Sequence, residues 1–244
     1  MHTAKALFKA SLGIGSFLKA PMVEAQPPRR AAPAPAPVMV PIRSIGPRER
    51  DRIAQHLLAL KPHDRYLRFG YAASDEQIQR YVDGLDFDRD ELFGIYNRRL
   101  DLIAMAHLAF APDDQLKDCA EFGVSVAEHA RGRGYGARLF ERAGVIARNE
   151  GVGMLFIHAL SENTAMLKIA RNAGATVVRS GSESEAHLQL PDATLDSRMS
   201  EIALEHYAEV DFQLKTRAKQ FWAFLATVQE IRSGVRAARE QSSA

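Results

Sequence analysis

The part of this 244-residue chain that is richest in possible chemistry is a glycine-rich turn, Arg131-Gly132-Arg133-Gly134-Tyr135-Gly136. It follows an apolar segment that predicts a strand (residues 122–126) and precedes a segment with helical periodicity that runs to about residue 150. A strand, a glycine-rich turn and a helix N-terminus together favour anion binding, because amides point outward and the helix dipole attracts negative charge. Two arginines add positive charge where a phosphate could lie. The turn therefore indicates phosphate binding, although such turns also serve as plain connectors.

Two common phosphate motifs do not fit this turn. The dinucleotide motif G-x-G-x-x-G needs its third glycine one position later than Gly136, and the P-loop needs Gly-Lys-Ser/Thr. A third motif does fit: Arg131-x-x-Gly134-x-Gly136 after a Val-Ser-Val strand resembles the acyl-CoA pyrophosphate loop of the GNAT superfamily of N-acyltransferases. The likeness covers about residues 38–190 and is strongest over 120–174.

Two further segments carry the resemblance. Residues 161–165, Ser-Glu-Asn-Thr-Ala, and a helix that ends at Gly174 look like the second cofactor-contacting helix of the family. Residues 64–69, Asp-Arg-Tyr-Leu-Arg-Phe, resemble an acceptor-side segment of bacterial relatives, including some protein-lysine acetyltransferases. Arg65 and Arg68 in this segment hint at a nearby carboxylate, and structural ion pairs explain them equally well.

The resemblance implies acetyl-CoA as co-substrate and assigns residues to it. The amides of residues 133–137 would bind the pyrophosphate, the backbone of Val124 and Val126 would pair with the pantetheine arm, and Asn163 would contact that arm. An amide near Val124 would polarise the thioester carbonyl. The predicted cofactor-binding residues are Val124, Ser125, Val126, Arg131, Gly132, Arg133, Gly134, Tyr135, Gly136, Ala137 and Asn163.

The acceptor implied by the resemblance is a primary amine, on a small molecule or a protein lysine. Because an amine must be neutral to attack and a lysine-like amine has a pKa of about 10.4, a general base is useful. Glu121 is the predicted base, and its alternative interpretation is a solvated carboxylate at a strand end. His107 and His158 lie on predicted strands, where a lone histidine is more often structural. The sequence shows no metal-ligand spacing, so we expect no metal.

One position departs from the family pattern. Ala170 stands where many relatives have a tyrosine that protonates the departing thiolate. Water, Tyr66 or Tyr135 would then donate the proton, or the thiolate leaves unassisted. A further alternative is a degenerate module that binds acyl-CoA for regulation or scaffolding without turnover.

These residues need a mixed α/β frame to position them. We expect strands at 38–44, 91–96, 102–110, 121–126, 154–159, 175–179 and 186–190. Helices are expected at 48–60, from a Ser74 capping box to 84, from the turn to 150, and from a Ser161 cap to 174. The predicted fold class is α/β (α+β): a GNAT-like, mostly antiparallel sheet flanked by helices.

The two ends differ from this frame. Residues 1–37 predict a disordered tail with a Pro/Ala-rich linker, residues 38–190 the acyltransferase domain, and residues 191–244 a helical extension. Acids dominate the first half of that extension and bases the second, which suits the helix dipole. An unbroken helix of this length must project, or pack on its own domain or on a partner, with a homodimer as one possibility.

Composition limits the remaining choices. A net charge of +2 argues against a uniformly basic, nucleic-acid-binding surface and leaves local basic patches open, and no apolar run reaches the length of a membrane span. Cys119 is the one cysteine, which excludes an intrachain disulfide and favours a reducing cytoplasm.

Overall fold

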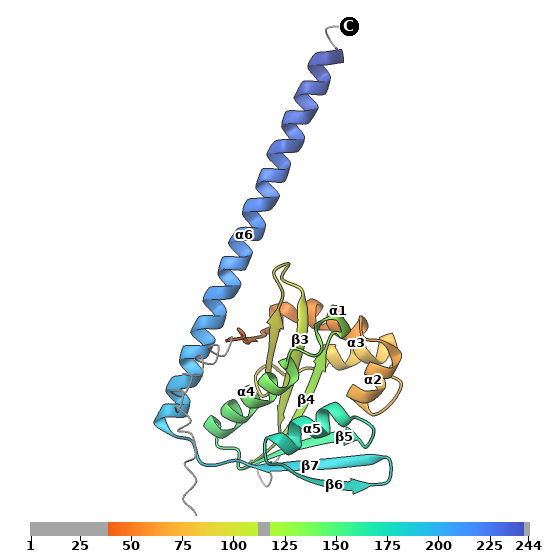
Figure 1. The fold of residues 1–244 in the computed structure, drawn as a ribbon, viewed down its shortest axis with the longest axis vertical. Coiled ribbons are helices and arrows are strands. Elements are labelled where there is room, and N and C mark those ends of the chain that lie inside the picture. Colours follow the sequence, from red (N-terminus) through yellow and green to blue (C-terminus); the bar gives the residue numbers. More distant parts are fainter. Residues whose placement is uncertain (1–38, 112–117, 242–244) are drawn as a thin grey trace, which may run out of the picture. The chain divides into compact units, whose positions relative to one another are not determined.

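The computed structural model describes residues 39–111 and 118–241, and these form a mixed α/β fold (Figure 1). Seven strands make one sheet in the order β1-β2-β3-β4-β5-β7-β6. The strands are β1 (Arg43–Ser44), β2 (Glu91–Tyr96), β3 (Leu102–Phe110), β4 (Cys119–Val126), β5 (Met154–Leu160), β6 (Thr176–Ser180) and β7 (Glu183–Gln189). The α-helices are α1 (Arg50–Leu58), α2 (Pro62–Phe69), α3 (Asp75–Asp83), α4 (Tyr135–Asn149), α5 (Thr164–Asn172) and α6 (Leu195–Gln241), with 3-10 turns at Pro47–Glu49 and Glu128–Ala130.

The strand pairing confirms the predicted fold class. Among the described strands, β4 and β5 are the one parallel pair, and the other pairs are antiparallel. Helices flank the sheet, and a long helix follows it in the chain. The predicted disordered tail lies outside the described residues.

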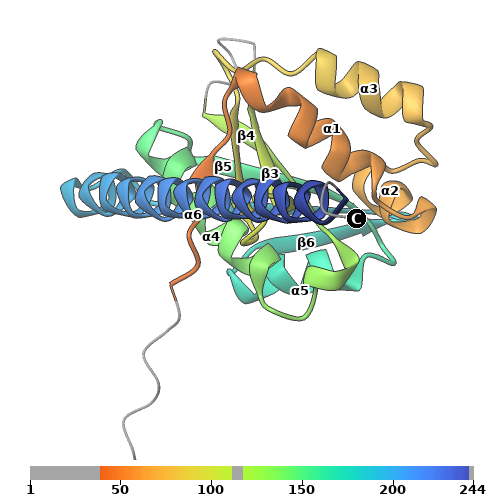
Figure 2. The same cartoon turned by 90° about the horizontal axis from the view of Figure 1, so that it is seen from above.

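Different helices cover the two faces of the sheet (Figure 2). In β3, Ala104, Ala106 and Leu108 belong to the core beneath α4 and α5, whereas Met105 belongs to the core formed with α1 and α3. This alternation follows from the two-residue period of a strand. Because both faces are covered, β2 and β3 are nearly continuous apolar runs rather than alternating ones.

The strands β4 and β5 pair only at their start. Their register joins Cys119–Glu121 to Met154–Phe156. Beyond Glu121, β4 continues along β3 as far as Val126, while β5 continues along β7 as far as Leu160. The two central strands therefore part, and the candidate site lies where they separate.

The C-terminal helix α6 is unbroken over 47 residues, or about 70 Å. Its first half packs on the sheet and its flanking helices (residues 39–190), which we call the body. Glu205 accepts hydrogen bonds from the Ser44 amide (3.1 Å) and from Arg142 Nη2 (3.0 Å). Lys219 Nζ donates to the Arg99 carbonyl at 3.1 Å, and the rest of the helix extends away from the sheet (Figure 1). None of the described helices combines the length and the apolar character that crossing a bilayer requires.

On the N-terminal side of the fold, the structure differs from the sequence prediction in two elements. The strand predicted at 38–44 covers only Arg43–Ser44, because Pro41 has no amide hydrogen for a ladder. The helix α2 was not predicted: Pro62 occupies its first turn, and Gly70 ends it with a φ of 78°.

The two predicted helix caps have different outcomes. Ser74 and Gln77 form the predicted capping box at the start of α3. The Ser161 cap is wrong: Asn163 caps α5 by accepting from the Met166 amide at 3.1 Å. Ser161 Oγ instead donates to the Glu183 carbonyl at 3.0 Å and ties β5 to β7.

Candidate functional site

The glycine-rich turn presents a row of backbone amides at the start of α4. Within the described residues, the five amides from Arg133 to Ala137 donate to no protein acceptor, and the first helical bond runs from Arg138 N to Gly134 O (3.1 Å). They lie at the N-terminus of the 15-residue helix α4, where the helix dipole favours an anion. The turn can therefore bind a phosphate through main-chain atoms alone.

The glycines of the turn are needed for two different physical reasons, backbone conformation and close helix packing. Gly132 and Gly134 both have a φ of 75°, a left-handed conformation that other residues adopt at a cost. A Cβ on Gly136 would lie 3.1 Å from Ile169 Cδ1, so this glycine lets α4 approach α5 closely. The spacing of the motif thus encodes a backbone shape.

The strand β4 offers a second set of main-chain groups. The Ala127 amide donates to the Ile103 carbonyl at 2.9 Å, so odd-numbered residues here direct their backbone groups toward β3. Val124 and Val126 therefore direct theirs to the opposite side, from which β5 has departed. An extended ligand can add there as a strand.

A groove of about 360 Å³ joins these two sets of groups. The turn, β4 and α5 line it, with Val124, Tyr135, Met166 and Ile169 among the apolar side chains. Asn163 lies at its edge, where its side chain caps α5 and its Nδ2 lies 3.5 Å from the Leu67 carbonyl. A narrow, mostly apolar groove that ends at unpaired amides fits a pantetheine arm and its pyrophosphate.

The two arginines of the turn make protein contacts. Arg131 Nη2 pairs with Asp64 at 2.7 Å, and its Nε donates to the Val126 carbonyl at 3.2 Å. Arg133 Nη2 lies 3.5 Å from the His129 carbonyl. Arg131 therefore fastens the turn to α2 as well as adding positive charge beside the groove.

Ser125 lies under the groove and hydrogen-bonds to a buried histidine. His56 Nε2 is 2.8 Å from Ser125 Oγ, and its Nδ1 is 2.9 Å from the Leu102 carbonyl. Burial lowers the pKa of His56 to about 4, so the ring is neutral. Since a carbonyl only accepts, Nδ1 carries the hydrogen and Ser125 donates to Nε2. This pair fixes β4 against α1.

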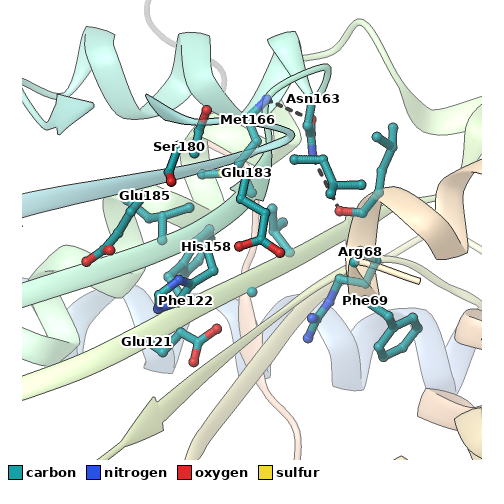
Figure 3. Close-up of a pocket in the computed structure, with 18 of the residues that line it drawn as sticks. Arg68, Phe69, Glu121, Phe122, His158, Asn163, Met166, Ser180, Glu183 and Glu185 are labelled. Carbon is teal, nitrogen blue, oxygen red and sulfur yellow. Dashed lines mark hydrogen bonds between the residues drawn. The ribbon is translucent and has the colours of Figure 1, made fainter. Parts of the chain in front are cut away.

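A second cavity, of about 450 Å³, opens on the α2 side of the parted strands (Figure 3). It meets the groove at Val124, Arg68 and Asn163, which line both. Polar and charged residues from four elements line it: Glu121 from β4, His158 from β5, Glu183 and Glu185 from β7, and Arg68 from α2. We define this space as the acceptor cavity, with the groove named above as the cofactor groove.

Carboxylates dominate the acceptor cavity. Among the described residues, Glu121, Glu183 and Glu185 form no ion pair with a basic side chain. Glu185 lies opposite His158 in the β5–β7 register. The cavity is therefore a region of negative potential suited to a cation.

Arg68 is held at the junction of the two spaces. A Cβ built on Gly123 would lie 2.6 Å from Arg68 Nη2, so the guanidinium rests directly against the bare backbone of β4. Its Nη2 donates to the Tyr81 hydroxyl at 3.0 Å, and its Cζ lies 5.1 Å from the Phe69 ring centre. The residue at 123 must be small for this contact to exist.

A chain of hydrogen bonds supports Arg68 from behind. The Tyr81 hydroxyl is 2.7 Å from His107 Nδ1, and His107 Nε2 is 3.0 Å from Asp90 Oδ2. A carboxylate only accepts, so Nε2–H donates to Asp90 and the Tyr81 hydroxyl donates to Nδ1. Burial lowers the pKa of His107 and raises that of Tyr81, which keeps both neutral near pH 7. His107 therefore positions other groups rather than facing the cavity.

The structure brings most predicted site residues together. Glu121 lines the acceptor cavity, and the predicted cofactor-binding residues line the cofactor groove except Arg133. Sequence reasoning missed His56, Tyr81, Glu183 and Glu185. The alternation Glu183-Ser184-Glu185 was a usable signal, because residues two apart on a strand share a face.

Position 170, where the resemblance implies a tyrosine, holds an alanine that cannot donate a proton. Ala170 is fully buried in α5. Tyr135 lines the cofactor groove, whereas Tyr66 stacks on His63 with ring centres 6.5 Å apart. Across the described residues, no group of three or more histidine, cysteine or acidic side chains is placed to hold a metal ion.

Comparison with known proteins relates this geometry to one family. Residues 56–175 match the family model described as "Acetyltransferase (GNAT) family". No curated protein sequence matches the chain significantly.

Solved structures share the fold. The GNAT domain of S. lividans PAT is 21% identical with a TM-score of 0.54, over 63% of this chain and 95% of that domain. An acetyltransferase of the GNAT family from Streptococcus pneumoniae is 11% identical with a TM-score of 0.51, over 62% of this chain and 98% of that one. At these identities the likeness concerns the fold alone.

Proposed function

This chain carries a domain of the GNAT acetyltransferase family, and on that premise we propose that it transfers an acetyl group from acetyl-CoA to a primary amine. The transfer would occur by direct attack with both substrates bound. The observation that carries the proposal is the row of amides at the start of α4 that have no acceptor among residues 39–111 and 118–241. This row ends a groove bounded by the edge of β4 from which β5 has departed. A main-chain anion site and a strand-like edge are what a nucleotide thioester needs.

Acetyl-CoA, when bound, supplies the acyl group as an activated thioester. The residues present fit it: amides 133–137 bind phosphate oxygens, and the backbone of Val124 and Val126 binds the pantetheine amides. Both sets hold the carbonyl carbon at the junction with the acceptor cavity. An amide of β4 near Val124 and the guanidinium of Arg68 would favour negative charge on the carbonyl oxygen during attack.

Glu121 is the proposed general base. The acidic acceptor cavity attracts the substrate as an ammonium ion, and Glu121 takes one proton so that the neutral amine can attack. Glu121 passes this proton to solvent. The C–N bond then forms, the C–S bond breaks, and the second proton goes from the amine nitrogen to the regenerated Glu121 carboxylate or to solvent. A water molecule or Tyr135 would protonate the thiolate, because Ala170 cannot.

The acidic walls support a cationic acceptor, either a small diamine or a lysine side chain. The test is acetyl-CoA consumption with a panel of diamines, amino acids and lysine peptides, alongside calorimetric titration with acetyl-CoA. We expect acetyl-CoA binding, and turnover with cationic amines in preference to anionic ones.

The second candidate function, acyl-CoA binding without turnover, is favoured by the buried alanine at position 170. Tight acetyl-CoA binding with no turnover on any member of the panel would select it. Absence of acetyl-CoA binding would contradict both functions.

A further inference from the structure

The helix α6 has two different faces. One face packs on the body through Glu205, Ala208, Phe212, Lys215 and Lys219: Ala208 is buried, Phe212 meets Tyr96 edge-on with ring centres 5.0 Å apart, and Lys215 Nζ donates to the Tyr96 carbonyl at 3.1 Å.

The opposite face is apolar and exposed. At 100° per residue, Val210, Leu214 and Phe221 lie about 160–180° from Phe212, and Phe224 lies about 120° from it. Their exposed fractions are 45%, 61%, 56% and 64%. We call Val210, Leu214, Phe221 and Phe224 the outer stripe.

The spacing of the outer stripe is that of a coiled coil. Its positions fall on a repeat of alternating four- and three-residue steps, which Arg217 completes, and the sequence continues the repeat with Val228 and Ile231. Such a repeat keeps one seam toward a second helix along its length. A single exposed apolar residue needs no explanation, but a continuous seam of large side chains indicates a partner helix.

The charge of α6 identifies the partner. Residues 195–214 carry five acids and one arginine, and residues 215–241 carry six basic residues and two acids. Of the five acids, Glu201, Glu205 and Glu209 pair with Arg142 or Arg43 of the body, which leaves Asp196 and Asp211 for a partner helix. A second copy of α6 in antiparallel orientation places each acidic half beside a basic half, and a parallel copy would place like charges together. We propose that two copies of this chain associate through antiparallel α6 helices along the outer stripe.

The proposed dimer is closed and leaves both bodies free. An antiparallel pair has a two-fold axis, so each chain uses the same surface. Opposing Asp211 to Arg217 puts that axis near Leu214. Each body packs on the face of its own helix opposite the seam, so the bodies lie on opposite sides of the helix pair.

Light scattering on the full chain during size exclusion tests the association. We expect about twice the 27.0 kDa chain mass for wild type. The variant Leu214→Glu/Phe221→Glu should run as a monomer with an unchanged helical circular dichroism signal. The matched control Gln213→Glu/Gln220→Glu adds the same charges beside the stripe and should stay dimeric. A monomeric wild type, or a dimeric stripe variant, would overturn the proposal.

Cysteine cross-linking in a Cys119→Ser background tests the orientation. Leu214→Cys, near the axis, should give a disulfide-linked dimer on oxidation. Met199→Cys should not, because in an antiparallel pair the two copies of residue 199 lie at opposite ends. Cross-linking at 199 would show a parallel pair and overturn the antiparallel arrangement, and no cross-link at 214 would contradict the seam.

Discussion

The cofactor groove and the acceptor cavity adjoin each other but use different chemistry. The groove offers backbone amides from the turn and from one strand edge, and its side chains are mostly apolar. The cavity offers charged side chains from β4, β5, β7 and α2. Main-chain recognition depends on backbone shape, whereas side-chain recognition depends on residue identity. Substitutions in the two regions should therefore affect different measurements.

The largest expected effect is on the groove. Gly134→Glu should weaken acetyl-CoA binding by at least about 100-fold in calorimetry, because it puts a negative charge beside the phosphate amides and strains a left-handed residue. The control is Gly151→Glu, at a φ of 84° with open space around it on the far end of α4. Equal losses in both variants would mean that strain, not phosphate repulsion, causes the effect.

The next effect concerns the cavity. Glu121→Gln should lower kcat by about 100-fold while the Kd for acetyl-CoA stays unchanged, because the amine loses its base. The control Glu185→Gln removes a neighbouring carboxylate and should raise the KM for the amine with a smaller change in kcat. An unchanged pH–rate profile for Glu121→Gln would remove the base role.

A smaller effect is expected at the junction. Tyr81→Phe removes the hydroxyl between Arg68 and His107 and should lower kcat/KM for the amine about tenfold, because Arg68 loses its fixed position. Acetyl-CoA affinity should change little. The control is Tyr71→Phe, which also removes one tyrosine hydroxyl, at an exposed position, and keeps this hydrogen-bond chain. A Tyr81→Phe enzyme with full kcat/KM would show that Arg68 does not depend on the chain.

The smallest expected effect is on stability rather than on catalysis, and it concerns the buried His56. The folded pKa of His56 is about 4, below the unfolded value of about 6.5, so the unfolded state binds more protons between these pH values. The free energy of unfolding should therefore fall by about 1 kcal/mol from this group between pH 7 and 5.5. His107, whose pKa burial also lowers, adds to the fall.

Urea unfolding at the two pH values measures the His56 effect. His56→Gln should flatten the pH dependence of the free energy of unfolding by about 1 kcal/mol relative to wild type. The same pH dependence in His56→Gln and wild type would contradict the assignment.

The same comparison explains what sequence could predict. The main-chain groups of the groove come from one contiguous stretch, residues 122–137, whose glycines specify left-handed turns and close helix packing, so the motif is local. The charged residues of the cavity, Arg68, Glu121, Glu183 and Glu185, are spread over a 118-residue span of the sequence. Only the fold, in which β4 and β5 separate, brings them together. The helix α2 was missed because eight residues carry too little periodicity to stand out.

The contact between α6 and α4 has a consequence for shortening the protein. Arg142 on α4 is 6% exposed, and Glu205 on α6 lies 3.0 Å from its Nη2. Asn149 and Ser197, both buried, join the same helices. Removing everything after residue 190 would strip a buried cation of its counter-charge, which is costly in a low-dielectric setting. A trimmed enzyme for crystallisation should therefore keep the chain through Lys219, so that the first half of α6 stays with the body.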